Sequence, residues 1–187
     1  MQTPPLSNAE RPLRPETLAK APAIVAQYPQ KRSATMPLLH LVQEDRGHIT
    51  QEDMHWVAEQ VGVAPMQVLE VVTFYPMFRQ AAIGRRHVRV CRTLSCALRG
   101  SYALMEGLEK ALGCPRGETS PDGDFTLEFV ECIADCGCGP VVHVDGAMHE
   151  NVQPQDAEKF AAQLKVTLKD PSYGQNPPVP GTPEWNG

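Results

Sequence analysis

The chain has 187 residues, of which 42% are hydrophobic and 21% are charged. These values are typical of a folded globular protein, and they exclude a largely disordered chain or a fibrous repeat. The formal net charge of −5 argues against a nucleic-acid-binding protein, because recognition of phosphate requires a basic surface.

The sequence gives no sign of a membrane-spanning segment. No apolar run approaches the roughly 18 residues that a spanning helix needs, and residues 1–15 lack the apolar stretch of a secretory signal. We therefore expect no direct membrane insertion and a cytoplasmic location. Because a reducing cytosol disfavours disulfides, the six cysteines point to metal binding or thiol chemistry.

The first part of the chain is predicted to be helical. Residues 1–15 are rich in proline and are expected to form a flexible leader, and residues 16–80 are expected to form a small helical bundle. Its helices are predicted at 16–27, from a cap at Ser33 to Gly47, from Thr50 to Gly62, and from Pro65 onward. Asp53 three residues after Thr50 indicates a capping box. The aromatic residues Phe74, Tyr75 and Phe78 are expected in the core, with seating of a partner as the alternative.

Strand and helix patterns alternate over residues 84–169. Strands are predicted at 87–91 and 125–130, helices at 101–112 and 155–168, and a hairpin at 140–152 around Asp145-Gly146. A small sheet with helices against it is the simplest arrangement, which places the chain in the α/β (α+β) class. The proline-rich residues 170–187 are predicted to be an extended tail, either unstructured or a docking arm that carries Trp185.

Four cysteines form two close pairs, Cys91-x4-Cys96 and Cys132-x3-Cys136, each after a predicted strand. Thiolates bind both zinc and iron-sulfur clusters, and a 2Fe-2S cluster needs two ligands for each iron. The x4 and x3 spacings favour a cluster over zinc, whose structural sites more often use x2 pairs. Neither pair is the Cys-x-x-Cys of a thioredoxin-type redox site, and neither loop holds the histidine of a Rieske centre.

Several alternatives stay open at this stage. Either Cys136 or Cys138 completes the second pair, whereas Cys114 is predicted to be a free thiol outside the site. Gly137 and Gly139 allow either a close backbone approach to the cluster or a plain turn. The competing function is a zinc-stabilised protein-interaction module without redox activity, in which the four thiolates only join two loops.

Five arginines surround the first cysteine pair, in contrast to the acidic chain as a whole. They form either a solvated basic face or an electrostatic support for an anionic cofactor or an acidic partner. They are Arg85, Arg86, Arg89, Arg92 and Arg99.

The sequence resembles the small iron-sulfur subunit (E type) of bacterial NADH:quinone oxidoreductase (respiratory complex I), with relatives in NAD-linked hydrogenases and formate dehydrogenases. The resemblance covers roughly residues 20–168. It is carried by the blocks at residues 28–43, 71–78, 88–96 and 131–136.

The resemblance implies a thioredoxin-like domain with one 2Fe-2S cluster on Cys91, Cys96, Cys132 and Cys136, and thus Cys136 rather than Cys138. It also implies an electron-carrying subunit without a catalytic site, beside a flavoprotein partner (F type) that binds NADH and FMN. The chain has no Gly-rich phosphate loop of its own. We expect further subunits of the complex as partners, no nucleic acid, and a place at the cytoplasmic membrane through the complex. Cys138 and Asp135 depart from the family pattern.

Overall fold

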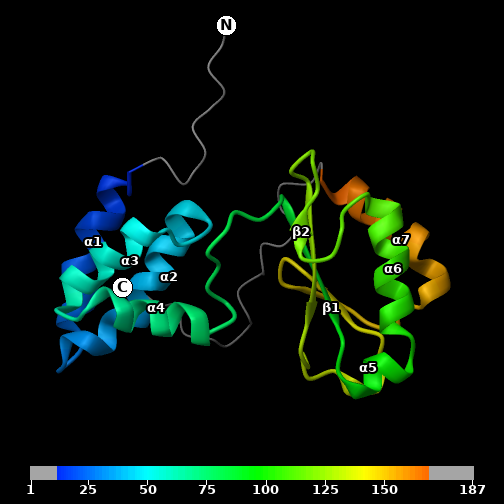
Figure 1. Cartoon of the computed structure of the whole chain (residues 1–187), viewed down its shortest axis with the longest axis horizontal. Helices are drawn as coiled ribbons and strands as arrows, with labels where there is room; N and C mark the ends of the chain where they lie inside the picture. The colour runs from blue at the N-terminus through cyan, green and yellow to red at the C-terminus, as the bar shows by residue number, and fades with distance from the viewer. Residues whose placement is uncertain (1–11, 169–187) are drawn as a thin grey trace, which may run out of the picture. The chain divides into compact units, whose positions relative to one another are not determined.

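The computed structural model describes residues 12–168, which form two units divided between Ala82 and Ile83 (Figure 1). Most of the predicted leader and the whole predicted tail, with Trp185, lie outside the described residues. Within the described part, no helix is both long and apolar enough to cross a membrane.

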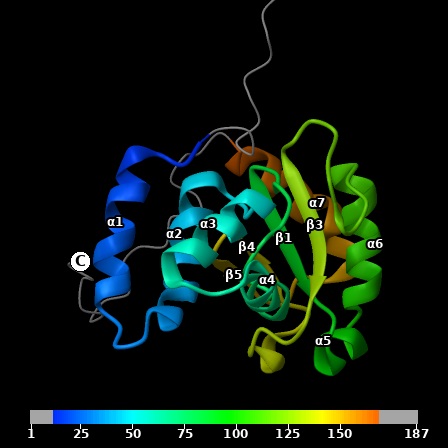
Figure 2. The ribbon, with the colours of Figure 1, turned by 60° about the vertical axis from the view of Figure 1, so that its left-hand side comes forward.

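The first unit consists of helices (Figure 2). Their buried side chains form an aliphatic core. Leu38, Leu39, Val57 and Val68 are fully buried at its centre. Because each helix contributes residues three or four positions apart, one face of each helix is removed from water. The helices are α1 (Pro15–Ala26), α2 (Thr35–Arg46), α3 (Gln51–Val61) and α4 (Pro65–Phe74), with the short 3-10 helix η1 (Lys31–Ala34) before α2.

The predicted start and end of α3 are confirmed. The amide of Asp53 donates to Oγ1 of Thr50 at 3.2 Å, and the Asp53 carboxylate accepts from the Thr50 amide at 2.9 Å, which completes the capping box. Gly62 ends the helix with a φ of +72°, a conformation that glycine adopts without a Cβ penalty. Asp53 also pairs with the buried Arg46 at 3.2 Å, so the cap joins α3 to α2.

Two predictions in this unit are wrong. Ser33 does not cap α2, because it lies inside η1 and the helix begins at Thr35, whose hydroxyl donates to the Arg32 carbonyl at 2.7 Å. Phe74 is 76% exposed, whereas Phe78 is buried as expected. The core-facing stripe of α4 runs through Val68 and Val72, and Phe74 lies two positions further on, about 200° around the helix.

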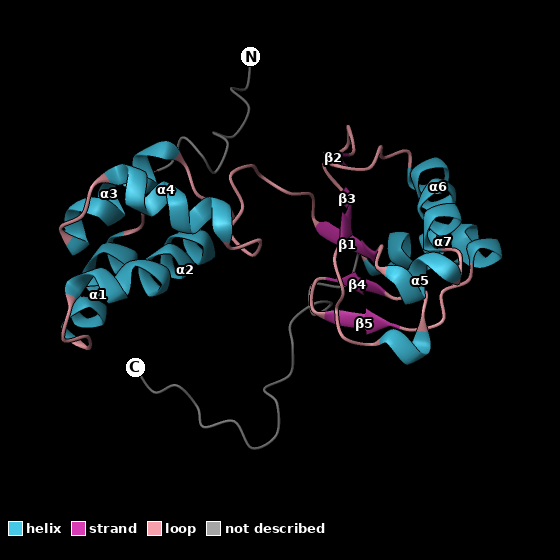
Figure 3. Ribbon diagram, turned by 60° about the horizontal axis from the view of Figure 1, so that its bottom comes forward, coloured by secondary structure: helices cyan, strands magenta, loops and turns pink. Residues whose placement is uncertain are grey.

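The second unit is a five-stranded mixed sheet with helices packed against it, in the order β2-β3-β1-β4-β5 (Figure 3). Only β1 and β3 are parallel, and the other neighbours are antiparallel. The predicted α/β class is confirmed. The strands are β1 (Arg86–Cys91), β2 (Glu118–Thr119), β3 (Phe125–Val130), β4 (Val142–Val144) and β5 (Ala147–His149). The helices are α5 (Leu94–Leu98), α6 (Ser101–Leu112) and α7 (Ala157–Thr167), with the 3-10 helix η3 (Pro154–Asp156) before α7.

Helices α6 and α7 pack against each other and form the core of this unit with the sheet. Val90 and Leu127 of the sheet and Leu108 and Leu164 of the helices are all buried. Two α5 residues, Leu94 and Leu98, are instead largely exposed. The sheet and the α6–α7 pair therefore form a rigid support on which the loops at the strand ends are held.

The hairpin is formed by the predicted Asp-Gly turn. Asp145 and Gly146 have φ values of +52° and +119°, and Val144 pairs with Ala147 across the turn. Positive φ at both central residues gives a turn whose twist matches that of the flanking strands. The two strands are shorter than predicted, and α5 and β2 were not predicted at all.

Candidate metal centre

The cysteine loops leave two neighbouring parallel strands at the same end of the sheet. Cys91, the last residue of β1, lies opposite Val130, the last residue of β3. The amide of Arg92 then donates to the Val130 carbonyl at 2.9 Å, so the strands remain paired up to the point where the loops begin. The two cysteine loops therefore begin side by side at one end of the sheet.

The first cysteine pair is buried. Cys91 and Cys96 are each 2% exposed, and they form a small apolar cluster with Val141 and Ile133. The residues between them are not an open loop, because α5 folds residues 94–98 into a helical turn that contains Cys96. Burial raises the pKa of the Cys96 thiol, and the neighbouring Cys91 and Cys136 raise it further.

The second pair lies at the surface, with Cys132 and Cys136 both exposed. Their Sγ atoms are 3.4 Å apart. The amide of Ala134 donates to Sγ of Cys132 at 3.4 Å and lowers the pKa of that thiol. Ala134 has a φ of +69°, a conformation rare for a residue with a Cβ, and it turns the loop back so that Cys136 approaches Cys132.

The two loops meet through the hydroxyl group of Thr93 and through one arginine. Oγ1 of Thr93 lies 3.2 Å from Sγ of Cys91 and also lowers the pKa of Cys132. Arg99 follows α5 and donates from Nη1 to the carbonyl oxygens of Gly137 at 2.9 Å and Gly139 at 3.2 Å. Residues of the first loop thus hold the second loop in place.

Gly139 and Gly137 differ in their surroundings. A Cβ built on Gly139 would lie 3.1 Å from Sγ of Cys96, whereas a Cβ on Gly137 would have nothing within 4 Å. Close approach, one of the two alternatives from the sequence, therefore applies to Gly139. Gly137 belongs to the 3-10 helix η2 (Cys136–Cys138), where the space beside it would accommodate a Cβ.

The remaining two cysteines have neighbours other than the four paired thiols. Cys138 faces Asp135 and Glu150, and these two carboxylates raise the pKa of its thiol. Cys114 is fully buried in the core of the second unit, where Sγ donates to the Glu118 carbonyl at 3.3 Å. Burial raises the pKa of Cys114 and so disfavours the thiolate form that binds metals.

Most of the arginines around the first pair form ion pairs or hydrogen bonds within the second unit. Arg86 is buried and pairs with Asp145 at 3.6 Å, so it does not belong to a solvated face. Arg92 pairs with Glu131 at 2.6 Å, an ion pair that raises the pKa of Arg92. Their acidic partners lie far away in the sequence, and no local pattern indicated them.

The donor set fits a thiolate-ligated metal centre. Two thiolates on one tetrahedral metal with bonds of about 2.3 Å would be about 3.8 Å apart, close to the 3.4 Å between Cys132 and Cys136. The amide at Cys132 and the hydroxyl at Cys91 are donors of the kind that orient and tune such ligands. The sequence alone did not predict α5, the Arg99 contacts or the partners of Cys138. The one available signal was for α5, because Thr93, a residue type that often caps helices, comes just after a predicted strand.

Comparison with known proteins decides the family. The model of the thioredoxin-like [2Fe-2S] ferredoxin family matches residues 21–165, which include all four of the paired cysteines. The chain belongs to this family. The match spans most of the sequence and confirms the resemblance inferred from the sequence blocks.

The curated relatives agree with this assignment. The chain is 43% identical over 149 residues to E subunit 2 of the NADH-quinone oxidoreductase of Rhizobium meliloti, covering 78% of this chain and 89% of the relative. It is 36% identical over 174 residues to the E subunit of the NADH-quinone oxidoreductase of Mycobacterium bovis, covering 90% of this chain and 69% of the relative. These proteins are the E-type relatives that the resemblance implied.

A solved structure supports the fold. The H2-reduced NAD+-reducing [NiFe]-hydrogenase contains a chain that aligns with 81% of this chain at a TM-score of 0.57 and 15% sequence identity. The aligned region is 24% of that chain. At this level of identity the match supports the arrangement of helices and strands, and nothing finer.

Proposed function

We propose that this chain carries one 2Fe-2S cluster on Cys91, Cys96, Cys132 and Cys136 and serves as an electron-transfer subunit of an NADH-oxidising assembly. The observation that supports this most directly is the meeting of two cysteine loops at the paired ends of β1 and β3. When bound, the cluster supplies a one-electron carrier whose potential depends on its ligands, hydrogen bonds and burial.

Cys136, rather than Cys138, is the proposed fourth ligand. The Sγ atoms of Cys132 and Cys136 are 3.4 Å apart, which supports this choice. Cys91 of the first pair is also close enough to raise the pKa of Cys136. Cys138 instead has Asp135 and Glu150 as its neighbours.

The proposed ligands come from two different environments. Cys91 and Cys96 supply thiolates from the apolar side, where Val141 excludes water. Cys132 and Cys136 supply thiolates from the exposed side. The exposed pair therefore gives a short route for electrons to and from a partner surface, while the buried pair anchors the cofactor.

The proposed host is an NADH dehydrogenase module of the complex I type, in which this chain makes and breaks no substrate bond. Relatives at 36–43% identity are named as E subunits of NADH-quinone oxidoreductase, which supports this assignment. We assign NADH and FMN to a flavoprotein partner (F type), since the chain has no Gly-rich phosphate loop. Its place is at the cytoplasmic face of the membrane, through the complex.

The test is the cofactor content of the protein purified without oxygen. We expect a brown-red protein with equal amounts of iron and acid-labile sulfide, and an electron paramagnetic resonance signal on reduction. Co-purification with a flavoprotein that oxidises NADH tests the proposed host. A colourless protein with one zinc ion at the four thiols would instead support a zinc-stabilised interaction module and overturn the proposal.

Two serine variants test the ligand assignment. Cys136→Ser should abolish or strongly alter the visible and paramagnetic spectra, because an alkoxide replaces a thiolate on iron. Cys138→Ser should leave both spectra unchanged. The reverse result would assign the fourth ligand to Cys138.

A further inference from the structure

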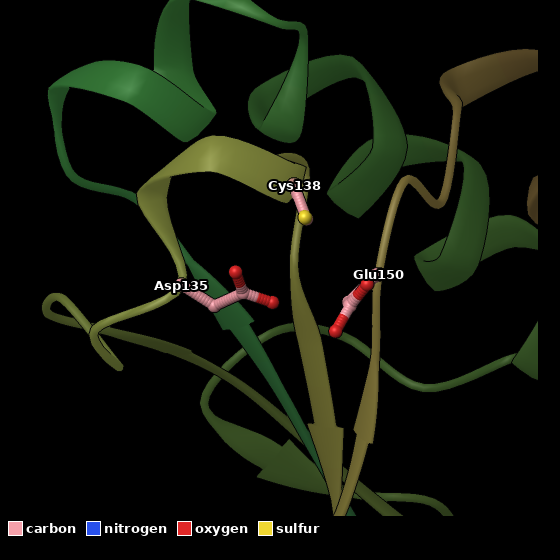
Figure 4. Close-up of side chains that lie close together, drawn as sticks. All are labelled: Asp135, Cys138 and Glu150. Atoms are coloured by element: carbon pink, nitrogen blue, oxygen red, sulfur yellow. The ribbon is translucent and has the colours of Figure 1, made fainter.

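A second group of metal-binding side chains lies beside the cysteine site. Asp135 precedes η2, Cys138 is its last residue, and Glu150 follows β5; their side chains point toward one another (Figure 4). One ligand atom from each, two carboxylate oxygens and one sulfur, all lie within 4.8 Å of one another. None of these three residues belongs to the four thiols assigned above.

Backbone hydrogen bonds fix the two segments that carry this group. The amide of Asn151 donates to the Cys138 carbonyl at 2.7 Å, and the amide of Val152 donates to the Pro140 carbonyl at 3.0 Å. Glu150 is therefore held opposite Cys138 by the residue that follows it. The arrangement depends on the fold of the second unit and not on a flexible side chain alone.

No ion pair within the described part of the chain compensates the charges of this group. Among the described residues, neither Asp135 nor Glu150 forms an ion pair, whereas Glu131 of the same loop pairs with Arg92; Lys159 lines the same hollow as Glu150 without forming such a pair. Two carboxylates and an ionisable thiol at this separation repel one another when charged. A bound cation would neutralise these charges. The relief of their repulsion would add to the affinity for the cation.

We propose that Asp135, Cys138 and Glu150 form a binding site for a thiophilic divalent cation of the zinc type. A thiolate ligand excludes Mg²⁺ and Ca²⁺, which take oxygen donors, and favours Zn²⁺. Metal bonds of about 2.0–2.3 Å in a tetrahedral site require donor atoms about 3.5 Å apart. Glu150 is exposed and lines a hollow of about 540 Å³, so its side chain is free to close the remaining gap and a hydrated cation can reach it.

The site has three protein ligands, which leaves a fourth position for water. Structural zinc sites are closed by four protein ligands, whereas a three-ligand site keeps an exchangeable position. We therefore expect reversible binding of Zn²⁺ and not a metal that the protein needs in order to fold.

The experiment is a titration of the full chain, purified without oxygen and with its native cofactor, with Zn²⁺ alone. Calorimetry and metal analysis should show one Zn²⁺ per chain, with iron and sulfide contents unchanged and with no competition from millimolar Mg²⁺. Cys138→Ser and Glu150→Gln should each weaken binding at least about tenfold, the loss seen even for outer partners of metal sites. Glu131→Gln, an exposed acid of the same loop, is the matched control and should bind as the parent does.

Three results would overturn the site: no Zn²⁺ bound, binding unaffected by Cys138→Ser and Glu150→Gln, or iron released as zinc enters. The proposed function is judged separately, by the iron and sulfide contents before zinc is added. A preparation without iron would overturn the proposed function. The effect of Glu150→Gln on zinc binding would still show whether the second site exists.

Discussion

Arg99 donates a hydrogen bond from Nη1 to the carbonyl oxygen of Gly137 at 2.9 Å, across 38 positions of sequence. The same nitrogen reaches the carbonyl of Gly139. The guanidinium thus joins the end of α5 to the loop of the second cysteine pair, and it positions proposed ligands that it does not itself touch.

Replacing Arg99 should loosen the second cysteine loop. We expect Arg99→Ala to cost on the order of 1 kcal/mol, as for loss of a partly exposed hydrogen bond, and to speed removal of the cluster by a chelator a few-fold. Arg99→Lys should restore only part of the lost stability, because lysine lacks the planar guanidinium group that holds several N–H donors in a fixed arrangement. Arg85→Ala is the control, since the exposed Arg85 pairs with Asp124 before β3, at the end of the sheet away from the cysteine loops. Equal rates for the two alanine variants would show that Arg99 does not hold the loop.

Gly139 should not tolerate a side chain. A Cβ 3.1 Å from Sγ of Cys96 forces the sulfur or the loop to move, so we expect Gly139→Ala to lower the iron content of the purified protein. Gly137→Ala is the matched control, because its Cβ meets nothing within 4 Å. The measurement is iron and sulfide per chain for both variants. Full occupancy in Gly139→Ala would show that the loop has more room than its geometry indicates.

Acid should destabilise the second unit through His143. Burial lowers the pKa of His143, and the adjacent Arg89, whose Nη2 lies 2.7 Å from Nδ1, lowers it further. As the pH falls below about 6.5, the unfolded chain binds a proton at this histidine while the folded chain does not. Stability therefore decreases with falling pH until the folded pKa is reached. Denaturant titrations from pH 8 to 5 should show a smaller decrease for His143→Gln than for the parent.

His149 should contribute to the same acid dependence, because burial lowers its pKa as well. The double variant with His143→Gln and His149→Gln should therefore have the flattest profile. An unchanged slope in this variant would assign the acid sensitivity to other groups.

The contact between α6 and α7 should be sensitive to one methyl group. A Cβ on Gly107 would lie 2.6 Å from Cβ of Ala157, so Gly107→Ala should destabilise the protein by about 1–3 kcal/mol despite the better helix propensity of alanine. Adding Ala157→Gly should recover much of the loss, and this non-additivity identifies the clash. The exposed Glu106→Ala serves as control in the same helix, with thermal unfolding as the measurement. Additive losses would argue against direct contact.

Local signals in the sequence were sufficient for much of the fold. The capping box at Thr50 and Asp53 and the Asp145-Gly146 turn were predicted correctly, because each depends on residues within four positions. The alternation of strand and helix after Gly84 also gave the two strands whose ends carry the cysteines, whereas their parallel pairing is a finding of the structure.

The features that the sequence did not indicate depend on distant residues or on very short segments. Helix α5 has five residues, too few for a periodic pattern, and it lies within the Cys91–Cys96 spacing. The contacts of Arg99 with Gly137 and of Cys138 with Glu150 join segments that only the folded sheet brings together. Phe74 is exposed because hydrophobicity alone does not determine the face of α4 on which a residue lies.

The parallel pairing of β1 with β3 has a consequence for how the cysteine site is assembled. These strands meet only after the whole segment through α5, α6 and β2 has been traversed, so the entropy of closing a long loop must be offset before any thiol finds its neighbours. Sheet pairing supplies hydrogen bonds and apolar burial that offset this entropy without any metal–sulfur bond. We therefore expect the sheet to fold before a metal binds between the two loops.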